Sequence, residues 1–140
     1  MSKKNASSKF AKKRYVSVSD FLKKKDKITL GPNNSAIFLK DPKWFSFLFA
    51  RYKFVSKMII NKKRVAEFGS AEGFAASIVA KEVKSLDLYD FHKNHYSVSK
   101  KFNKFQKNIN VYNQDILSLN GKIKYDAIYS LDVLEHIDKK

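Results

Sequence analysis

Residues 65–74 read Val-Ala-Glu-Phe-Gly-Ser-Ala-Glu-Gly-Phe, and this stretch decides the fold of the chain. A short apolar run ends in the carboxylate of Glu67. It then breaks into a turn with Gly69 and Gly73, two of the four glycines in the chain. In α/β sheets, a strand that ends in a glycine turn and passes into a helix holds a nucleoside-containing ligand against its backbone. The stretch therefore predicts a parallel sheet with a ligand site at its first turn.

The rest of the chain extends this pattern. From Arg64 onward, apolar runs alternate with helical patterns, which is typical of a parallel sheet flanked by helices. Strands are expected at 64–68, 85–91, 109–113 and 125–131, and helices at 74–82, at 93–107 and from Asp132 onward. The predicted fold class is thus α/β, with an incomplete sheet of about four strands and an N-terminal helical extension.

Three segments are predicted along the chain. Residues 1–27 carry ten Lys and Arg against two acids and are expected to form a flexible basic arm. Residues 28–61 are expected to form an N-terminal helical segment, and residues 62–140 the partial sheet domain.

Two local sequence patterns in the helical segment mark a turn and the start of a helix. Gly31-Pro32-Asn33-Asn34 predicts a turn, whereas Asp41-Pro42 predicts a helix start with Asp as the N-cap. The helix that follows carries an apolar stripe from Trp44 to Ile59, which we expect to pack on the sheet. A substrate platform is the alternative for this face, with Trp44 and Tyr52 as its first candidates.

Length and composition limit the classes of protein that fit. A chain of 140 residues has room for one domain and a tail. It has no cysteine, no apolar run near the roughly 18 residues of a membrane span, and no apolar stretch after its lysine-rich start. These features favour a cytoplasmic location.

The net charge of +16 invites a nucleic-acid partner, but nearly all of the excess is lysine. Nucleic acid is therefore disfavoured, though it stays open.

Three carboxylates fall where successive strands are expected to end. Glu67 closes the first strand, Asp90 the second, and Asp115 follows the third. Asp90 lies 17 residues after Gly73, near the spacing at which a carboxylate reaches the ribose hydroxyls of a nucleoside on the first turn. The structural alternative is that such acids are solvated or cap the next helix.

Two arguments disfavour a dinucleotide at the first turn. Like charges about 4 Å apart cost roughly 1 to 4 kcal/mol, so a carboxylate at Glu67 opposes a pyrophosphate. A dinucleotide fingerprint also needs glycines at its first, third and sixth positions, whereas Ala71 and Phe74 occupy the third and sixth positions here. A nucleoside with a positively charged end is favoured instead. S-adenosylmethionine, with its ammonium and sulfonium groups, meets that requirement.

Four motifs in order resemble those of the class I S-adenosylmethionine-dependent methyltransferases, whose sheet is Rossmann-like. They are Glu67–Gly73, Leu88–Asp90, Gln114–Ile116 and Tyr125–Ile137, with Ala71 in place of the usual middle glycine. The resemblance implies that Glu67 holds the methionine ammonium, directly or through a water molecule, while Asp90 binds the ribose and Asp115 the adenine amine. The whole implied cofactor set is Glu67, Phe68, Gly69, Ser70, Gly73, Asp90, Phe91, Asp115, Ile116 and Ser130.

No catalytic residue is identified by the sequence, and His136 and Asp132 are the candidates for a general base. Asp132 and Glu135 also fit a helix-capping pair, which would leave His136 merely solvated. His92 and His95 lie near Asp90, but nothing else supplies a coordination set. No metal is therefore expected.

The resemblance implies methyl transfer, and the fourth motif bears on the acceptor. Ser130-Leu131-Asp132-Val133 differs from the Asn/Asp-Pro-Pro-aromatic pattern of enzymes that methylate base amino groups. An O or C nucleophile on a small molecule or sugar is therefore expected. Alternatives are an RNA-associated methyltransferase that docks through the basic arm, and a truncated, inactive fragment.

Because the class is seven-stranded, we interpret the chain as the cofactor-binding part of a longer protein, with a missing half or a partner over the edge of the fourth strand.

Overall fold

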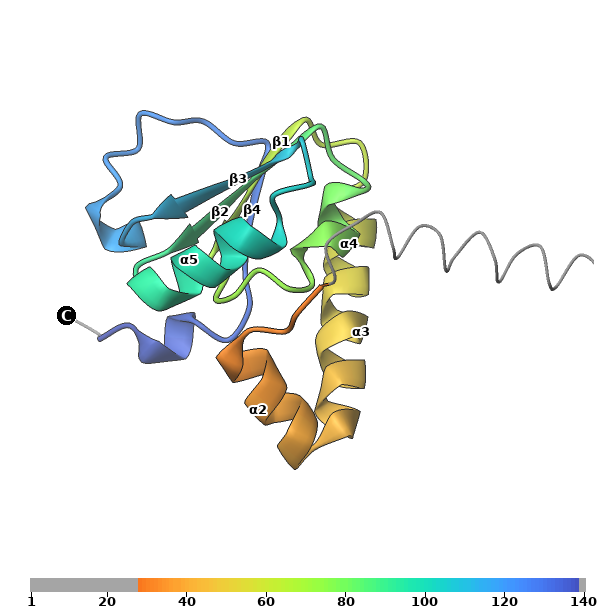
Figure 1. The fold of residues 1–140 in the computed structure, drawn as a ribbon. Coiled ribbons are helices and arrows are strands. Elements are labelled where there is room, and N and C mark those ends of the chain that lie inside the picture. Colours follow the sequence, from red (N-terminus) through yellow and green to blue (C-terminus); the bar gives the residue numbers. More distant parts are fainter. Residues whose placement is uncertain (1–27, 139–140) are drawn as a thin grey trace, which may run out of the picture.

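A four-stranded parallel sheet forms the centre of the molecule (Figure 1). The computed structural model describes residues 28–138, so the predicted basic arm lies outside the described part. The strands follow the order β3-β2-β1-β4. Their bounds are β1 Arg64–Phe68, β2 Ser85–Asp90, β3 Ile109–Asn113 and β4 Ala127–Ser130. The α/β prediction is confirmed, and the bounds of β1 and β3 match those expected from the sequence.

The register brings the ends of the strands together at one edge. Glu67 lies opposite Leu88 on one side and Tyr129 on the other, and Asp90 lies opposite Asn113. Because all four strands run parallel, the loops that follow them meet at the same edge of the sheet. That edge is where the strand-end acids were expected.

The helices are α2 Pro32–Lys40, α3 Pro42–Met58, α4 Ala76–Ala80 and α5 Lys93–Phe102, with single 3₁₀ turns η1 Ile116–Ser118 and η2 Leu134–His136. Helices α3 and α4 share one hydrophobic core with the sheet. Val65, Val79, Leu86 and Leu88 at its centre are completely shielded from solvent. Burial of such side chains contributes roughly 1.5 to 3 kcal/mol each, so this core fixes the strands below the loops.

The later part of the predicted apolar stripe packs into the core that α3 shares with the sheet. Asp41 caps the helix by accepting a hydrogen bond from Lys43 N at 3.0 Å, which confirms the predicted start. Phe45, Tyr52, Val55 and Ile59 are buried, whereas Trp44 at the first turn is 41% exposed.

The turn predicted at residues 31–34 is wrong. Gly31 is the N-cap of α2, and Pro32 is its first residue. The first turn of this helix is held by Glu72, which accepts hydrogen bonds from Asn33 N at 2.8 Å and Asn34 N at 2.9 Å. Pro fits the first helical position as well as it fits a turn, and the anchoring partner lies 38 residues away in sequence. The local pattern therefore did not reveal the helix.

Three helix predictions also need correction. The helix expected at 93–107 ends at Phe102, because the buried Asn103 leaves the helix and donates to Ser99 O at 3.0 Å and Gly73 O at 3.2 Å. The helix expected at 74–82 is confined to α4. No long helix begins at Asp132, whose φ of 56° is left-handed, and only η2 follows it among the described residues. The predicted capping pair is therefore wrong.

Within residues 28–138, no helix has the length and apolar character needed to cross a membrane.

Candidate functional site

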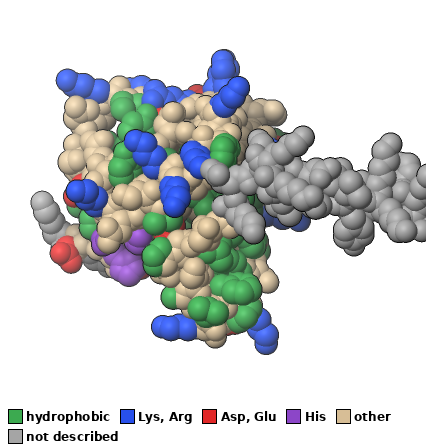
Figure 2. All heavy atoms as spheres, viewed as in Figure 1, with side chains coloured by type: hydrophobic (Ala, Val, Ile, Leu, Met, Phe, Trp, Pro, Cys, Tyr) green, Lys and Arg blue, Asp and Glu red, His purple; other side chains and the backbone are tan. Residues whose placement is uncertain are grey.

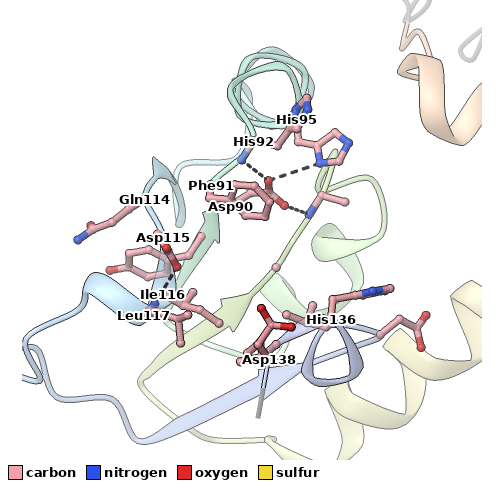
Figure 3. A pocket seen from close by; sticks show the side chains of 16 residues that line it. Asp90, Phe91, His92, His95, Gln114, Asp115, Ile116, Leu117, His136 and Asp138 are labelled. Atoms are coloured by element: carbon pink, nitrogen blue, oxygen red, sulfur yellow. Dashed lines mark hydrogen bonds and ion pairs between the residues drawn. The ribbon is translucent and has the colours of Figure 1, made fainter. Parts of the chain in front are cut away.

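A cavity of about 630 Å³ opens at the edge of the sheet where the strands end (Figure 3). Each of the four strands contributes to its wall through the loop that follows it. The lining residues are Gly69, Ala71, Tyr89, Asp90, Phe91, His92, His95, Gln114, Asp115, Ile116, Leu117, Asp132, Val133, His136, Ile137 and Asp138. This volume lies within the range of small-molecule and cofactor sites.

Asp90 is the polar centre of this cavity. Its carboxylate accepts hydrogen bonds from Ala71 N and from His92 N, both at 2.8 Å, and lies 3.4 Å from His95 Nδ1. These contacts join the end of β2 to the loop of residues 69–73, called the glycine loop, and to the start of α5, as Figure 3 shows. A carboxylate has about four acceptor positions, so lone pairs remain for a ligand hydroxyl.

Asp115 and Ile116 lie on another side of the cavity, in the loop after β3. Asp115 caps the η1 turn by accepting a hydrogen bond from Leu117 N at 2.9 Å, and its side chain is exposed. Ile116 is half-buried, while Phe91 and Leu117 are largely exposed. Apolar side chains beside an exposed carboxylate suit a flat heterocycle that carries an amino group.

The glycine loop needs its unusual backbone. Gly69 has a φ of 74°, and a Cβ there would lie 2.2 Å from a Val133 methyl. Gly73 has a φ of 62°, and a Cβ there would lie 2.3 Å from Ser99 Oγ. Ala71, between them, also adopts a left-handed φ of 47°. An L-residue pays roughly 1 to 2 kcal/mol for that conformation, so the departure from the expected glycine carries local strain.

Glu67 lies beneath the loop and lines neither this cavity nor the second one described below. Its side chain is buried and accepts hydrogen bonds from Tyr129 Oη at 2.8 Å and from Tyr52 Oη. Burial raises the pKa of Glu67 to about 7, although both hydroxyl bonds act to lower it. The carboxylate thus lies outside the wall of both cavities, and its role toward the ligand stays a prediction. The carboxylates in the cavity wall are those of Asp90, Asp115, Asp132 and Asp138.

A second cavity of about 230 Å³ lies between the glycine loop and helices α2 and α3. Ser70 and Gly73 line this cavity, while Gly69, Ala71 and Asp132 line both cavities. The predicted residues Phe68 and Ser130 line neither. They join β1 to β4, because Ser130 Oγ donates to Phe68 O at 3.0 Å.

The two candidates for a general base both lie in the wall of the larger cavity. Asp132 forms an ion pair with Arg51 of α3, whereas His136 in η2 is exposed. The rings of His92 and His95 lie 4.7 Å apart. Nevertheless, no group of three potential metal ligands occurs among residues 28–138.

Sequence reasoning missed the partners that hold the site together. Tyr129, Arg51 and Glu72 contact the site through hydrogen bonds or ion pairs that span 38 to 81 residues of sequence. Tyr52 was assigned to the apolar stripe, with a substrate platform as the alternative, whereas its hydroxyl donates a hydrogen bond to Glu67. The polar hydroxyl of Tyr52 within an apolar stripe was the one sequence feature that could have indicated a buried hydrogen bond.

Lysine and arginine side chains are spread over the face seen in Figure 2 and do not gather in a single patch. This distribution adds no support for a nucleic-acid interface on that face. Docking through the basic arm concerns residues outside the described part, so it stays a prediction.

Neither a protein-family model nor a curated protein matches this chain. Among solved structures, it is similar to the methyltransferase domain of bacterial CtHen1-C, with a TM-score of 0.57, 24% identity, and coverage of 64% of this chain and 52% of that one. It is also similar to the N-methyltransferase NodS from Bradyrhizobium japonicum WM9, with a TM-score of 0.56, 19% identity, and coverage of 63% and 49%. NodS in complex with S-adenosyl-L-homocysteine gives a TM-score of 0.53 at 19% identity over 59% and 42%.

The chain spans about half the length of these structures or less. The likeness, together with the four-stranded parallel sheet, shows that the chain has a class I methyltransferase fold over the part that is matched.

Proposed function

We propose that this chain binds S-adenosylmethionine and takes part in transfer of its methyl group. The observation that carries the proposal is the cavity at the strand ends, with Asp90 and Asp115 in its wall on either side of apolar residues. The fold likeness supports it, since one similar structure holds S-adenosyl-L-homocysteine.

The cofactor supplies a methyl group on a sulfonium that is already a good leaving group. The chain's task is to bind, orient and exclude water. Asp90 keeps lone pairs for the two ribose hydroxyls, and the exposed Asp115 accepts from the adenine amine. Phe91 and Ile116 provide apolar surface beside the base. Asp90 also fixes the loop through Ala71 N, so the ribose partner and the loop conformation are coupled.

We further propose that the acceptor is an O or C nucleophile of a small molecule or sugar, supported by the sequence Ser130–Val133 at the end of β4. If such an acceptor needs a base, His136 is better placed than Asp132, because Asp132 is already paired with Arg51. A His136→Gln variant should then lower kcat while cofactor affinity is kept.

Calorimetric titration with S-adenosylhomocysteine tests the binding proposal. We expect the wild-type chain to bind it and Asp90→Asn to bind it at least tenfold more weakly, since two hydrogen bonds to a charged acceptor are weakened. Asp41→Asn is the matched control, because Asn caps α3 as well as Asp does. Titration with NAD should give no heat of binding. Tighter binding of NAD than of S-adenosylhomocysteine would overturn the proposal.

A further inference from the structure

All three histidines of the chain, His92, His95 and His136, line the larger cavity at the strand ends. Within residues 28–138, no lysine or arginine lines this cavity, so the histidines are the side chains of its described wall that can carry a positive charge. Histidine changes its charge between roughly pH 5 and 8. The charge of this wall therefore depends on pH near neutrality.

His95 is the histidine whose ring faces the carboxylate of Asp90 (Figure 3). Its Nδ1 lies 3.4 Å from Asp90 Oδ1, and its side chain is 32% exposed, whereas that of Asp90 is 8% exposed. A neutral imidazole donates from one of its nitrogens, whereas an imidazolium donates from both. A proton on His95 therefore turns this contact into a charge-assisted hydrogen bond to Asp90.

The acceptor positions of Asp90 are already half used by the backbone. Oδ1 accepts from His92 N and Oδ2 from Ala71 N, both at 2.8 Å. A carboxylate has about four acceptor positions, so about two remain, one for each ribose hydroxyl. A protonated His95 takes the remaining position on Oδ1. The proton and one ribose hydroxyl then compete for the same lone pair.

The other charged groups of the wall lie on several elements. On α5, the ring of His92 lies 4.7 Å from that of His95, so a proton on one opposes a proton on the other. The glycine loop contributes only the uncharged Gly69 and Ala71. The loops after β3 and β4 contribute Asp115, Asp132, His136 and Asp138. Figure 3 shows that Asp90 is nearer to His95 than Asp115, His136 and Asp138 are.

We propose that His95 is a positioning residue that makes nucleoside binding depend on pH. When it is uncharged, it leaves Asp90 free to accept from both ribose hydroxyls, and when it is protonated, it occupies Asp90 Oδ1 itself. This inference rests on the proposed function. Because the free site binds a proton that the nucleoside displaces, affinity should rise with pH and binding should release a proton.

Two nucleosides and three variants test this competition by calorimetry at pH 5.5 and pH 8. The first ligand is 5′-methylthioadenosine, which has both ribose hydroxyls and no amino-acid end that titrates. The second is its 2′-deoxy form, which has one hydroxyl fewer for Asp90. The variants are His95→Ala and two matched controls, His92→Ala and His136→Ala, which remove the other two histidines of the same cavity.

We expect the wild-type chain to bind 5′-methylthioadenosine about tenfold more tightly at pH 8 than at pH 5.5, the effect of one hydrogen bond to a charged acceptor. His95→Ala should bind it at both pH values within threefold of the wild-type affinity at pH 8. His92→Ala and His136→Ala should keep the pH dependence. The 2′-deoxy nucleoside should bind the wild type more weakly, with less than a threefold change between the two pH values.

A second measurement needs no variant. Titration of the wild-type chain near pH 6.5 in two buffers of different ionisation enthalpy counts the protons released when 5′-methylthioadenosine binds. We expect a release of up to one proton, and none with the 2′-deoxy nucleoside. Binding of 5′-methylthioadenosine without proton release would overturn the inference.

Equal affinities of the wild type for 5′-methylthioadenosine at both pH values would overturn the inference and leave the proposed function intact. The same holds if the pH dependence persisted in His95→Ala, or disappeared in His92→Ala or His136→Ala instead. If the wild-type chain bound neither 5′-methylthioadenosine nor S-adenosylhomocysteine at pH 8, the proposed function itself would fail, and this inference with it.

Discussion

Tyr129 Oη donates a 2.8 Å hydrogen bond to Glu67 Oε2, across neighbouring strands and directly below the glycine loop. Burial and the adjacent carboxylate raise the pKa of Tyr129 well above its usual value, so the hydroxyl stays protonated and remains a donor. Glu67, in turn, has a pKa raised to about 7. The protonation state of one buried group is therefore coupled to the support of the loop.

This coupling predicts a pH-dependent stability. Between the usual pKa of 4.5 and the folded value of about 7, the folded chain binds more protons at Glu67 than the unfolded chain does. The free energy of unfolding should therefore fall as pH rises through this window, by roughly 1 to 3 kcal/mol. Urea unfolding at pH 5 and pH 7.5 measures the difference. In the Glu67→Gln variant, the free energy of unfolding should change much less between these two pH values. If it changed as much as in the wild type, the pH dependence would come from other groups.

A second prediction concerns the hydroxyl of Tyr129. Tyr129→Phe keeps the ring in the core and removes one donor to Glu67. The loss should cost about 1 to 3 kcal/mol above pH 7, where the carboxylate is charged, and less at pH 5, where it is protonated. Unfolding curves at the two pH values check this. An equal loss of stability at both pH values would mean that the Tyr129 hydroxyl does not preferentially stabilise the charged carboxylate of Glu67.

The glycine loop gives a matched pair of substitutions. Gly73→Ala should destabilise the fold by about 2 kcal/mol or more, because its φ is 62° and the added Cβ would meet Ser99 Oγ. Ala71→Gly should leave stability unchanged or raise it by up to about 1 kcal/mol, because it relieves a left-handed φ but adds freedom to the unfolded chain. Thermal denaturation distinguishes them. Equal effects of the two changes would contradict the loop conformation described here.

Asp115 provides a prediction on base recognition. Asp115→Asn replaces one acceptor oxygen with a donor, so the preference for an adenine amine over a guanine or hypoxanthine carbonyl should shrink by about tenfold. Competition of the adenine, guanine and hypoxanthine nucleosides for the site measures this preference. The variant should fold normally, since Asn also caps a turn. An unchanged preference would exclude Asp115 from the base pocket.

The sequence predicted the features that depend on neighbouring residues. The strands at 64–68 and 109–113 are flanked by polar residues and turns, so the local sequence pattern was enough to locate them. Asp90 and Asp115 were expected at one edge because the ends of parallel strands meet there, and both line the cavity at that edge.

The features that sequence pattern missed depend on distant partners. Glu72 anchors α2 across 38 residues, and Asp132 meets Arg51 across 81. Asn103 ends α5 early because its amide finds the backbone of the glycine loop, 30 residues before it. Each of these contacts exists only after the chain has packed, so no local periodicity reveals it.

In the proposed function, the cavity at the strand ends holds the adenosine of a sulfur nucleoside, with its ribose on Asp90. A crystal structure of this chain with S-adenosylhomocysteine tests it most directly. We expect both ribose hydroxyls within hydrogen-bond distance of the Asp90 carboxylate and the base between Phe91 and Ile116. A nucleoside bound away from the Asp90 carboxylate would contradict it.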